Sequence, residues 1–274
     1  MDVTFEKPYK VMLGNADMFR IILVGCGGTG GYIAETVARF AWDLKQVGKR
    51  VHIVFIDHDL VEENNIGRQR FAPAELGLNK AICLANRYNL AFGLEIVAVE
   101  RPFSAEMLSL WRDRFTGGAT TLLVGAVDNA EARQEMAKAV EAENGRLWCL
   151  DAGNAFHNGN VYLGNLTKSG QLKLDSEMML ASGFPSPFVQ DPALLVPEKK
   201  HAVKETEERS GSCAMRIMRR EQSMVINQQM GSLLGRYLEC WLVERELTFM
   251  HTAVSLHIPA MQTTMATGES LRKA

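Results

Sequence analysis

Cysteine pairs with the spacing of a metal site are missing from this chain of 274 residues. Its five cysteines are scattered and none forms a C-x-x-C pair, so the sequence indicates neither a structural zinc site nor a disulfide framework. No stretch approaches the roughly 20 apolar residues of a membrane helix, and the N-terminus lacks the layout of a signal peptide. With 30 basic against 32 acidic residues, nothing indicates a broad cationic face for nucleic acid. We therefore predict a cytoplasmic protein that binds neither membranes nor, directly, nucleic acid.

The chain does have enough apolar residues, 47%, for a substantial core in one large α/β domain or two small ones. Apolar runs typical of buried strands alternate with amphipathic stretches typical of helices. Such alternation favours parallel pairing with right-handed crossovers. We therefore predict a Rossmann-like, doubly wound α/β fold with a mainly parallel sheet. The predicted strands are 21–25, 51–56, 95–99, 121–127 and 147–150, and the predicted helices are 29–46, 78–92, 105–114 and 129–144.

The pattern changes after about residue 155, where the parallel half of the sheet is expected to close. Residues 158–166 resemble an antiparallel strand, and 167–212 combine four prolines with a charged run, which indicates a mobile crossover loop. Residues 213–247 have helical periodicity, with Gly231 and Gly235 as expected small contacts, and 254–258 is a candidate edge strand. We predict a single domain over 1–274, with a nucleotide-binding core at 20–155 and the C-terminal helix and edge strand at 213–258.

A glycine-rich turn follows the first predicted strand. Gly25, Gly27 and Gly30 fit the pattern G-x-G-x-x-G between a strand and a helix. In such a turn the missing side chains let backbone N–H groups approach phosphate oxygens at the N-terminus of the helix. The motif alone is weak, because glycine turns also serve merely to pack a helix close to a strand. Its weight comes from polar residues further along the chain.

Two aspartates close the second predicted strand. In a dinucleotide-binding fold, an acidic residue at this point accepts hydrogen bonds from ribose hydroxyls, and Asp57 is the candidate. Asp59 follows two residues later and is a candidate to cap the next turn. Capping is an alternative role for either aspartate.

The residues after the second strand favour ATP over NAD. Adenylyl transfer needs fixed donors and cations for the charge that develops on a triphosphate, and Asn65, Arg68 and Lys80 supply them. Arg68 offers a fork-shaped donor set and Lys80 a mobile point charge. A single basic residue here would more simply be a solvated one, but the combination with Asn65 favours a phosphate site.

Asp128 stands where the fourth predicted strand meets a helix, at the sheet edge where open α/β folds bind ligands. A carboxylate there is suited to hold Mg²⁺ together with the phosphates of a substrate. The alternative is that Asp128 caps the helix 129–144, and the two roles are compatible.

These motifs together resemble the ThiF/MoeB/HesA family and the adenylation domains of ubiquitin-activating enzymes. The resemblance covers about residues 20–155 and rests on GCGGTGG, IDHDLVEENNIGRQRF, the lysine of GLNKA and LVGAVDN, in that order. It implies a homodimeric adenylyltransferase that uses ATP and Mg²⁺ to adenylate the C-terminal glycine carboxylate of a ubiquitin-like protein, releasing pyrophosphate. It also implies a set of nucleotide-site residues: Gly25, Gly27, Gly28 and Gly30 at the phosphates, Asp57 at the ribose, Asn65, Arg68 and Lys80 at the triphosphate, Asp128 at the metal, and Asp59, Gln69 and Asn129 in the same motifs.

A narrower resemblance, to the ThiF-related protein of the PRTRC cassette, rests on Ser212-Cys213-Ala214 before a long helix. A helix N-terminus and the nearby Arg216 would favour the thiolate of Cys213. In the family, a cysteine in this region can accept the activated carboxyl as a thioester, or sulfur as a persulfide, so we predict a catalytic role for Cys213. The alternative is a cysteine buried under the helix.

The chain also departs from the family. Zinc-binding C-x-x-C pairs, frequent among members, are missing, so no structural zinc is expected. Residues 1–19 contain no arginine, although many members use one there to reach the ATP of the partner subunit. That absence leaves open a catalytically silent scaffold that binds a ubiquitin-like partner. An NAD- or FAD-dependent oxidoreductase is the other alternative.

Overall fold

A computed structural model describes residues 6–112, 119–197 and 223–273 of the chain. An eight-stranded sheet has the order β12-β11-β7-β6-β5-β2-β3-β4. Its strands are β2 (Met18–Val24), β3 (Arg50–Ile56), β4 (Val97–Val99), β5 (Thr120–Gly125), β6 (Leu147–Asn154), β7 (Asn158–Gly164), β11 (Phe249–Ser255) and β12 (Ala260–Met265).

The half of the sheet from β4 to β6 is parallel, and β7, β11 and β12 continue it in antiparallel pairs. All seven residues of β2 are buried, as expected for a central strand covered on both faces. The chain winds from β2 through β3 to β4 on one side, then returns to β5 on the other side of β2. In open α/β sheets, ligands bind at the carboxyl ends of the strands where the strand order reverses, which here is between β2 and β5.

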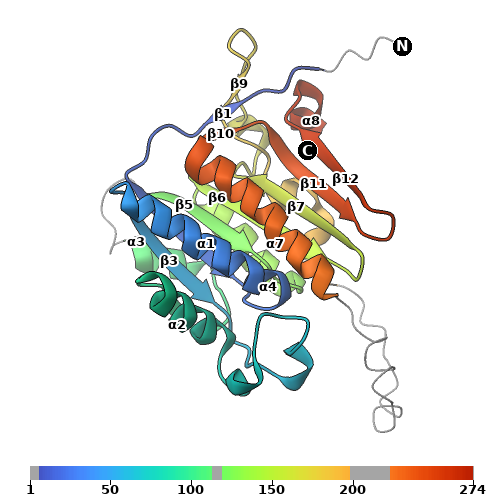
Figure 1. Ribbon diagram of the computed structural model, residues 1–274. Helices are drawn as coiled ribbons and strands as arrows, with labels where there is room; N and C mark the ends of the chain where they lie inside the picture. The colour runs from blue at the N-terminus through green and yellow to red at the C-terminus, as the bar shows by residue number, and fades with distance from the viewer. Residues whose placement is uncertain (1–5, 113–118, 198–222, 274) are drawn as a thin grey trace.

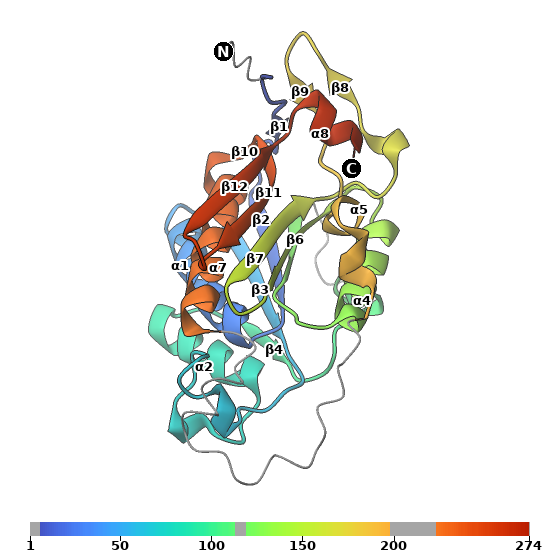
Figure 2. The same cartoon turned by 90° about the vertical axis from the view of Figure 1, so that its right-hand side faces the viewer.

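Helices cover both faces of the sheet (Figure 1). One hydrophobic core joins the sheet to α1 (Gly28–Gln46), α2 (Lys80–Phe92) and α7 (Met224–Glu239). A second core joins the opposite face to α3 (Glu106–Arg112), α4 (Ala130–Ala142) and the short α5 (Pro187–Gln190). Figure 2 shows the sheet edge-on, with α7 and α4 on opposite sides. The doubly wound, mainly parallel fold predicted from the sequence is confirmed.

Helices α1 and α7 lie side by side (Figure 1). A Cβ added at Gly231 would collide with Cβ of Tyr32, and one added at Gly235 would lie 3.2 Å from Cγ2 of Thr36. These two glycines are therefore the small-residue contacts expected from the sequence, and they let α7 approach the helix that follows the glycine turn.

The C-terminal elements differ in detail from the prediction. The described helix α7 gives way to a π-helical turn (Cys240–Glu244), which ends where Arg245 adopts a φ of +57°. Because the stop is not a glycine, the sequence pattern gave no sign of it. The edge strand predicted at 254–258 is instead a hairpin of β11 and β12. Almost every residue of β12 is exposed, so it lacks the alternating apolar pattern that identifies a strand.

Part of the predicted crossover loop, 167–197, contains regular elements. Two short strands pair, β8 (Leu174–Asp175) with β9 (Leu180–Ala181), and α5 and a 3₁₀ turn (Pro192–Leu195) follow. Two of the prolines taken as loop signals, Pro187 and Pro192, stand in the first turn of these helical segments, where the missing N–H costs nothing. Residues 198–212 lie outside the described residues.

The N-terminal strand β1 (Val11–Met12) pairs with β10 (Glu246–Leu247) just after the π-helical turn. Among the described residues, no helix combines the length and apolar character that crossing a bilayer demands.

Candidate functional site

The glycine turn occupies the switch point between β2 and β5. Gly25 has a φ of +89°, and a Cβ there would lie 2.5 Å from the carbonyl oxygen of Ala126. A Cβ at Gly30 would overlap the carbonyl oxygen of Gly25, and one at Gly28 would lie 2.5 Å from Nδ2 of Asn227. Close packing alone therefore explains these three glycines. The packing role weighed from the sequence is real, and it is compatible with a phosphate at the same turn.

The N-terminus of α1 has the character of an anion site. Gly27 is its N-cap residue, makes no side-chain cap and has no acidic residue after it in the first turn. A Cβ at Gly27 would lie 3.6 Å from the side-chain amide of Gln69, so this side of the turn is more open than the other three positions. The free N–H groups and the positive end of the helix dipole favour a negatively charged ligand.

Asp57 ends β3 and ties the glycine turn to the next loop. Its Oδ2 accepts a hydrogen bond from the backbone N–H of Cys26 at 2.6 Å, and its Oδ1 accepts one from the N–H of Asp59 at 2.9 Å. Burial raises the pKa of the Asp57 carboxyl, while these two hydrogen bonds and the nearby Lys80 act in the opposite direction. These bonds shape the Asp57–Asp59 turn and the start of the glycine turn, and none of the described helices has Asp57 as its N-cap. Each oxygen retains a further lone pair for a ribose hydroxyl.

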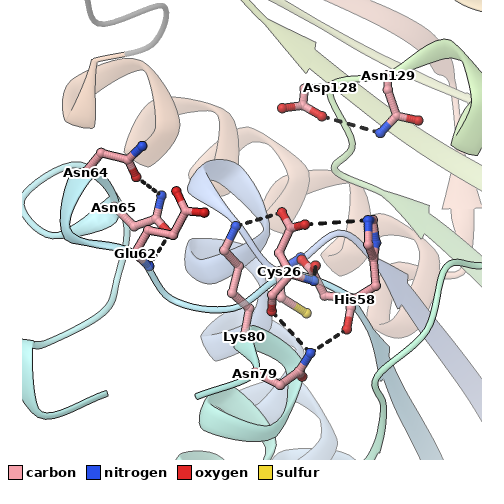
Figure 3. Close-up of polar contacts among 11 residues, drawn as sticks. Cys26, His58, Glu62, Asn64, Asn65, Asn79, Lys80, Asp128 and Asn129 are labelled. Carbon is pink, nitrogen blue, oxygen red and sulfur yellow. Dashed lines mark hydrogen bonds and ion pairs between the residues drawn. The ribbon is translucent and has the colours of Figure 1, made fainter. Parts of the chain in front are cut away.

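A buried lysine, Lys80, is close enough to lower the pKa of this aspartate, and Figure 3 shows it near Cys26 and Asn79. The Lys80 ammonium pairs with Oδ2 of Asp59 at 2.9 Å, and only 8% of the lysine side chain is exposed, against 54% for that of Asp59. Asn79 holds the arrangement, because its Nδ2 donates to the carbonyl oxygens of Asp57 and Asp59 while its Oδ1 caps α2 at the N–H of Ile82. Asn79 was not among the residues predicted from the sequence, although an asparagine before a helical pattern is an N-cap signal.

A short 3₁₀ turn (Glu63–Asn65) carries the next group of candidates. Asn65 is buried, accepts at Oδ1 from the N–H of Glu62 and donates from Nδ2 to Oδ1 of Asn64. Its amide therefore shapes the turn itself. Arg68 donates from Nε to the carbonyl oxygen of Asn64 at 3.1 Å, and its two terminal nitrogens have no partner among the described residues.

Gln69 follows Arg68 and lies against Gly27, as described above. Its Oε1 is buried and has no hydrogen-bond partner within the described parts of the chain. The Arg68–Gln69 turn therefore brings the Gln69 amide to the open side of the glycine turn, while the Arg68 guanidinium contacts the carbonyl oxygen of Asn64. Both are donors suited to phosphate oxygens.

Two roles were predicted for Asp128, capping of α4 and metal binding, and the structure gives the capping role to its neighbour Asn129. The cap of α4 is Asn129, whose Oδ1 accepts from the N–H of Ala132 at 2.8 Å. Asp128 is not the cap. Among the described residues, its exposed carboxylate has one hydrogen-bond contact, 3.4 Å to Nδ2 of Asn129, and Figure 3 shows it apart from Lys80 and Cys26. The carboxylate of Asp128 is thus available for a cation at the carboxyl edge of the sheet.

A buried ion pair, Arg133 with Asp151, contacts the loop that carries Asp128. Arg133 donates to the carbonyl oxygen of Val127 at 2.7 Å and pairs through Nε with Oδ2 of Asp151 at 3.2 Å. Burial raises the pKa of the fully buried Asp151 carboxyl, and Arg133 partly offsets that effect. The sequence analysis assigned neither residue a role.

Two other sets of groups bear on metal binding and catalysis. Cys213, with Arg216, lies outside the described residues, and the cysteines within them are buried and unpaired.

In the described parts of the chain, Asp57, His58 and Asp59 form the single group of three potential metal ligands within 4.8 Å of one another. Asp59 already pairs with Lys80, and the side chain of His58 is exposed.

Part of the predicted set is joined by contacts, because Asp57 binds the glycine turn, Lys80 pairs with Asp59 and Gln69 lies beside Gly27. Within the described residues, neither Asp128 nor the guanidinium of Arg68 makes a hydrogen bond to this group. A ThiF family model matches residues 13–206, well over half of the chain. The protein belongs to the ThiF family. It is 31% identical over 121 residues to ubiquitin-like modifier-activating enzyme 5 of Bombyx mori, a match covering 41% of this chain and 28% of that one. It is 36% identical over 87 residues to the ATP-dependent ubiquitin transferase-like protein Cap2 of Escherichia coli strain TW11681, covering 31% and 14%.

Solved structures share the fold of this ThiF-family chain. MccB of E. coli, crystallised with ATP, has a TM-score of 0.56 at 14% identity, over 93% of this chain and 65% of that one. PaaA has a TM-score of 0.53 at 14% identity, over 91% and 64%. This chain therefore spans about two thirds of the matched structures and under a third of the matched sequences.

Proposed function

We propose that this ThiF-family protein is an adenylyltransferase of the type that activates ubiquitin-like modifiers. In this proposal the C-terminal glycine carboxylate of a small ubiquitin-like protein is adenylated with ATP. The observation that carries the proposal is the buried Lys80 ammonium, held 2.9 Å from Asp59 beside the glycine turn that Asp57 fixes. A cation this enclosed, next to a helix N-terminus without acidic residues, is suited to a polyphosphate.

The chemistry needs no general base. A carboxylate is already ionised at neutral pH, so its oxygen can attack the α-phosphorus directly. One O–P bond forms to the carboxylate, the bond from the α-phosphorus to the bridging oxygen breaks, and pyrophosphate leaves with that electron pair. Lys80, Arg68 and the N-terminus of α1 would bind the triphosphate and stabilise the charge that develops on it. Positioning of the two reactants would supply much of the remaining acceleration.

Asp128 would hold Mg²⁺ in this reaction. The fit rests on its exposed carboxylate, which is not consumed by helix capping, and on the preference of Mg²⁺ for one or two carboxylates plus phosphate oxygens. When bound, the ion would neutralise phosphate charge. Asp57 would hold the ribose.

The fate of the adenylate belongs to the same proposal. The Cys213 thiolate would attack the activated carbonyl carbon, forming a thioester and releasing AMP. A homodimer in the cytoplasm is the proposed setting.

The test is ATP-dependent pyrophosphate exchange, measured with short glycine-terminated proteins encoded beside this gene. Exchange by the wild-type chain, reduced about 10²- to 10³-fold in Lys80→Ala, would support the proposal. Lys49→Ala is the matched control, because Lys49 also pairs with an aspartate at 2.9 Å, but at the opposite end of β3. Partner binding without exchange would favour the scaffold, and binding of NAD in place of ATP would favour an oxidoreductase. Either outcome would overturn the proposal.

A further inference from the structure

We propose that Asn227 is a positioning residue that fixes the Arg68–Gln69 turn against the glycine turn. Asn227 lies in the first turn of α7, about 160 residues beyond Arg68 in sequence, and its side chain is completely buried. It belongs to none of the motifs recognised in the sequence. The inference rests on the proposed function in that Arg68 is taken as a ligand of the triphosphate.

The amide of Asn227 joins three separate segments. Its Nδ2 donates to the carbonyl oxygen of Arg68 at 3.2 Å. Its Oδ1 accepts from Nδ2 of Asn154, at the end of β6, at 3.1 Å and from Oγ1 of Thr29, in α1, at 3.5 Å. Oγ1 of Thr29 also lies 3.0 Å from Oδ1 of Asn154, so its single hydroxyl proton is shared between the two amide oxygens and the three side chains form a ring. Donor and acceptor are each used, and only an amide offers both in one planar group of this size.

The glycine turn is shaped around this amide. The Asn227 side chain fills the volume that a Cβ at Gly28 would need. Glycine at position 28 is thus required by a side chain about 200 residues further along the chain. Helix α7 therefore contributes, through Asn227, to the shape of the glycine turn.

The contact with Arg68 has a direct consequence for that residue. Nδ2 of Asn227 holds the main chain of Arg68, whereas, within the described residues, the guanidinium is held through Nε alone, to the carbonyl oxygen of Asn64. Losing the donor of Asn227 would leave the Arg68 carbonyl without this buried partner, which costs free energy unless the turn moves toward water. A moved turn would carry the Gln69 amide away from Gly27 and displace the Arg68 guanidinium from its place on Asn64.

Two variants separate positioning from general stability. Asn227→Leu keeps the number and branching of side-chain heavy atoms but offers no hydrogen bond, and Asn227→Ala removes the group. Ser223→Ala is the control on the same helix, because Ser223 caps α7 at the N–H of Ile226 and does not touch Arg68. If one Asn227 variant fails to fold, the measurements below are made on the other.

The first measurement is hydrogen exchange of the Arg68 and Gln69 amides, which donate to the carbonyl oxygen of Asn65. We expect exchange at these amides to accelerate about tenfold or more in the Asn227 variants and to stay unchanged in Ser223→Ala. Equal acceleration in the control, or none in the Asn227 variants, would overturn the proposal. This measurement needs no nucleotide, so it decides the role of Asn227 even if the proposed enzymatic function fails.

The second measurement is a double-mutant cycle on binding of ATP with Mg²⁺. Asn227→Leu should weaken binding about tenfold in the wild-type background and have almost no effect in an Arg68→Ala background, because Asn227 acts through Arg68. Additive losses would contradict this coupling. Absence of ATP binding by the wild-type protein would overturn the proposed function, with the exchange result still deciding the positioning role.

Discussion

The backbone N–H of Cys26 donates to the carboxylate of Asp57 at 2.6 Å, across 31 positions of sequence. Cys26 stands in the glycine turn after β2, and Asp57 ends β3, the parallel neighbour of β2. The two strand ends are in register, with Val24 beside Ile56, so the aspartate meets the turn as a direct result of strand pairing. A residue considered for ribose therefore also holds the glycine turn in shape.

Replacing Asp57 with asparagine should test this double role. The two oxygens of Asp57 accept from two N–H groups, and an amide would present an NH₂ group to one of them. We expect a loss of stability of about 1–3 kcal/mol, together with weaker ATP binding. Chemical denaturation and a nucleotide titration measure the two effects. Asp43→Asn, on the exposed side of α1, is the control and should change neither.

Glycine at position 30 should be required for folding regardless of any ligand. A Cβ there overlaps the carbonyl oxygen of Gly25, and the backbone must shift to accept it. We expect Gly30→Ala to lower the unfolding free energy by about 1–3 kcal/mol. Gly170→Ala is the control, because no atom lies within 4 Å of the added Cβ and its φ is not positive. A thermal melt of Gly30→Ala equal to that of the control would contradict this reading of the turn.

Asp128 and Asn129 should separate function from stability. Asn129→Ala removes the cap of α4 and should cost about 0.5–2 kcal/mol of stability. Asp128→Asn removes an exposed carboxylate that caps nothing, so its thermal unfolding should match that of the wild type while Mg²⁺-dependent exchange activity falls. The opposite distribution, a destabilised Asp128→Asn and an unaffected Asn129→Ala, would show that the capping assignment is wrong.

Asp151 should give the protein a pH-dependent stability. Because burial raises the pKa of this carboxyl, the folded state binds its proton more tightly than the unfolded state does. The contribution to stability therefore falls as the pH rises from the ordinary carboxyl range, about 3.9, through the higher folded-state value.

The measurement is urea unfolding of the wild type and of Asp151→Asn between about pH 4 and about pH 8. The free energy of the wild type minus that of the variant should decline over this range. Subtracting the variant removes the titration of all other groups. A difference that stays constant or increases with pH would show that Arg133 outweighs the cost of burial.

The individual site contacts differed in how far the sequence could predict them. Gly25 and Asp57 follow adjacent strands, so their proximity came directly from the strand pattern. The cap of α4 was assigned from the sequence to Asp128, whereas Asn129 is the cap. Two adjacent polar residues before a helix are equal candidates for this role. The strand β12 was missed because its side chains are mostly exposed. Asn79 had a local signal, whereas Asn227 and the pair of Arg133 with Asp151 had none.

The amino-acid sequence by itself determined the alternation of strands and helices, the glycine turn and the order of the motifs, since each depends on residues near one another in the chain. Only the tertiary structure decided that α7 returns to lie on α1 and places Asn227 against Gly28 and Arg68. It also decided that the ammonium of Lys80 is enclosed beside Asp59. Burial and hydrogen bonding between distant segments depend on how the layers pack, and no local pattern of residues records that packing.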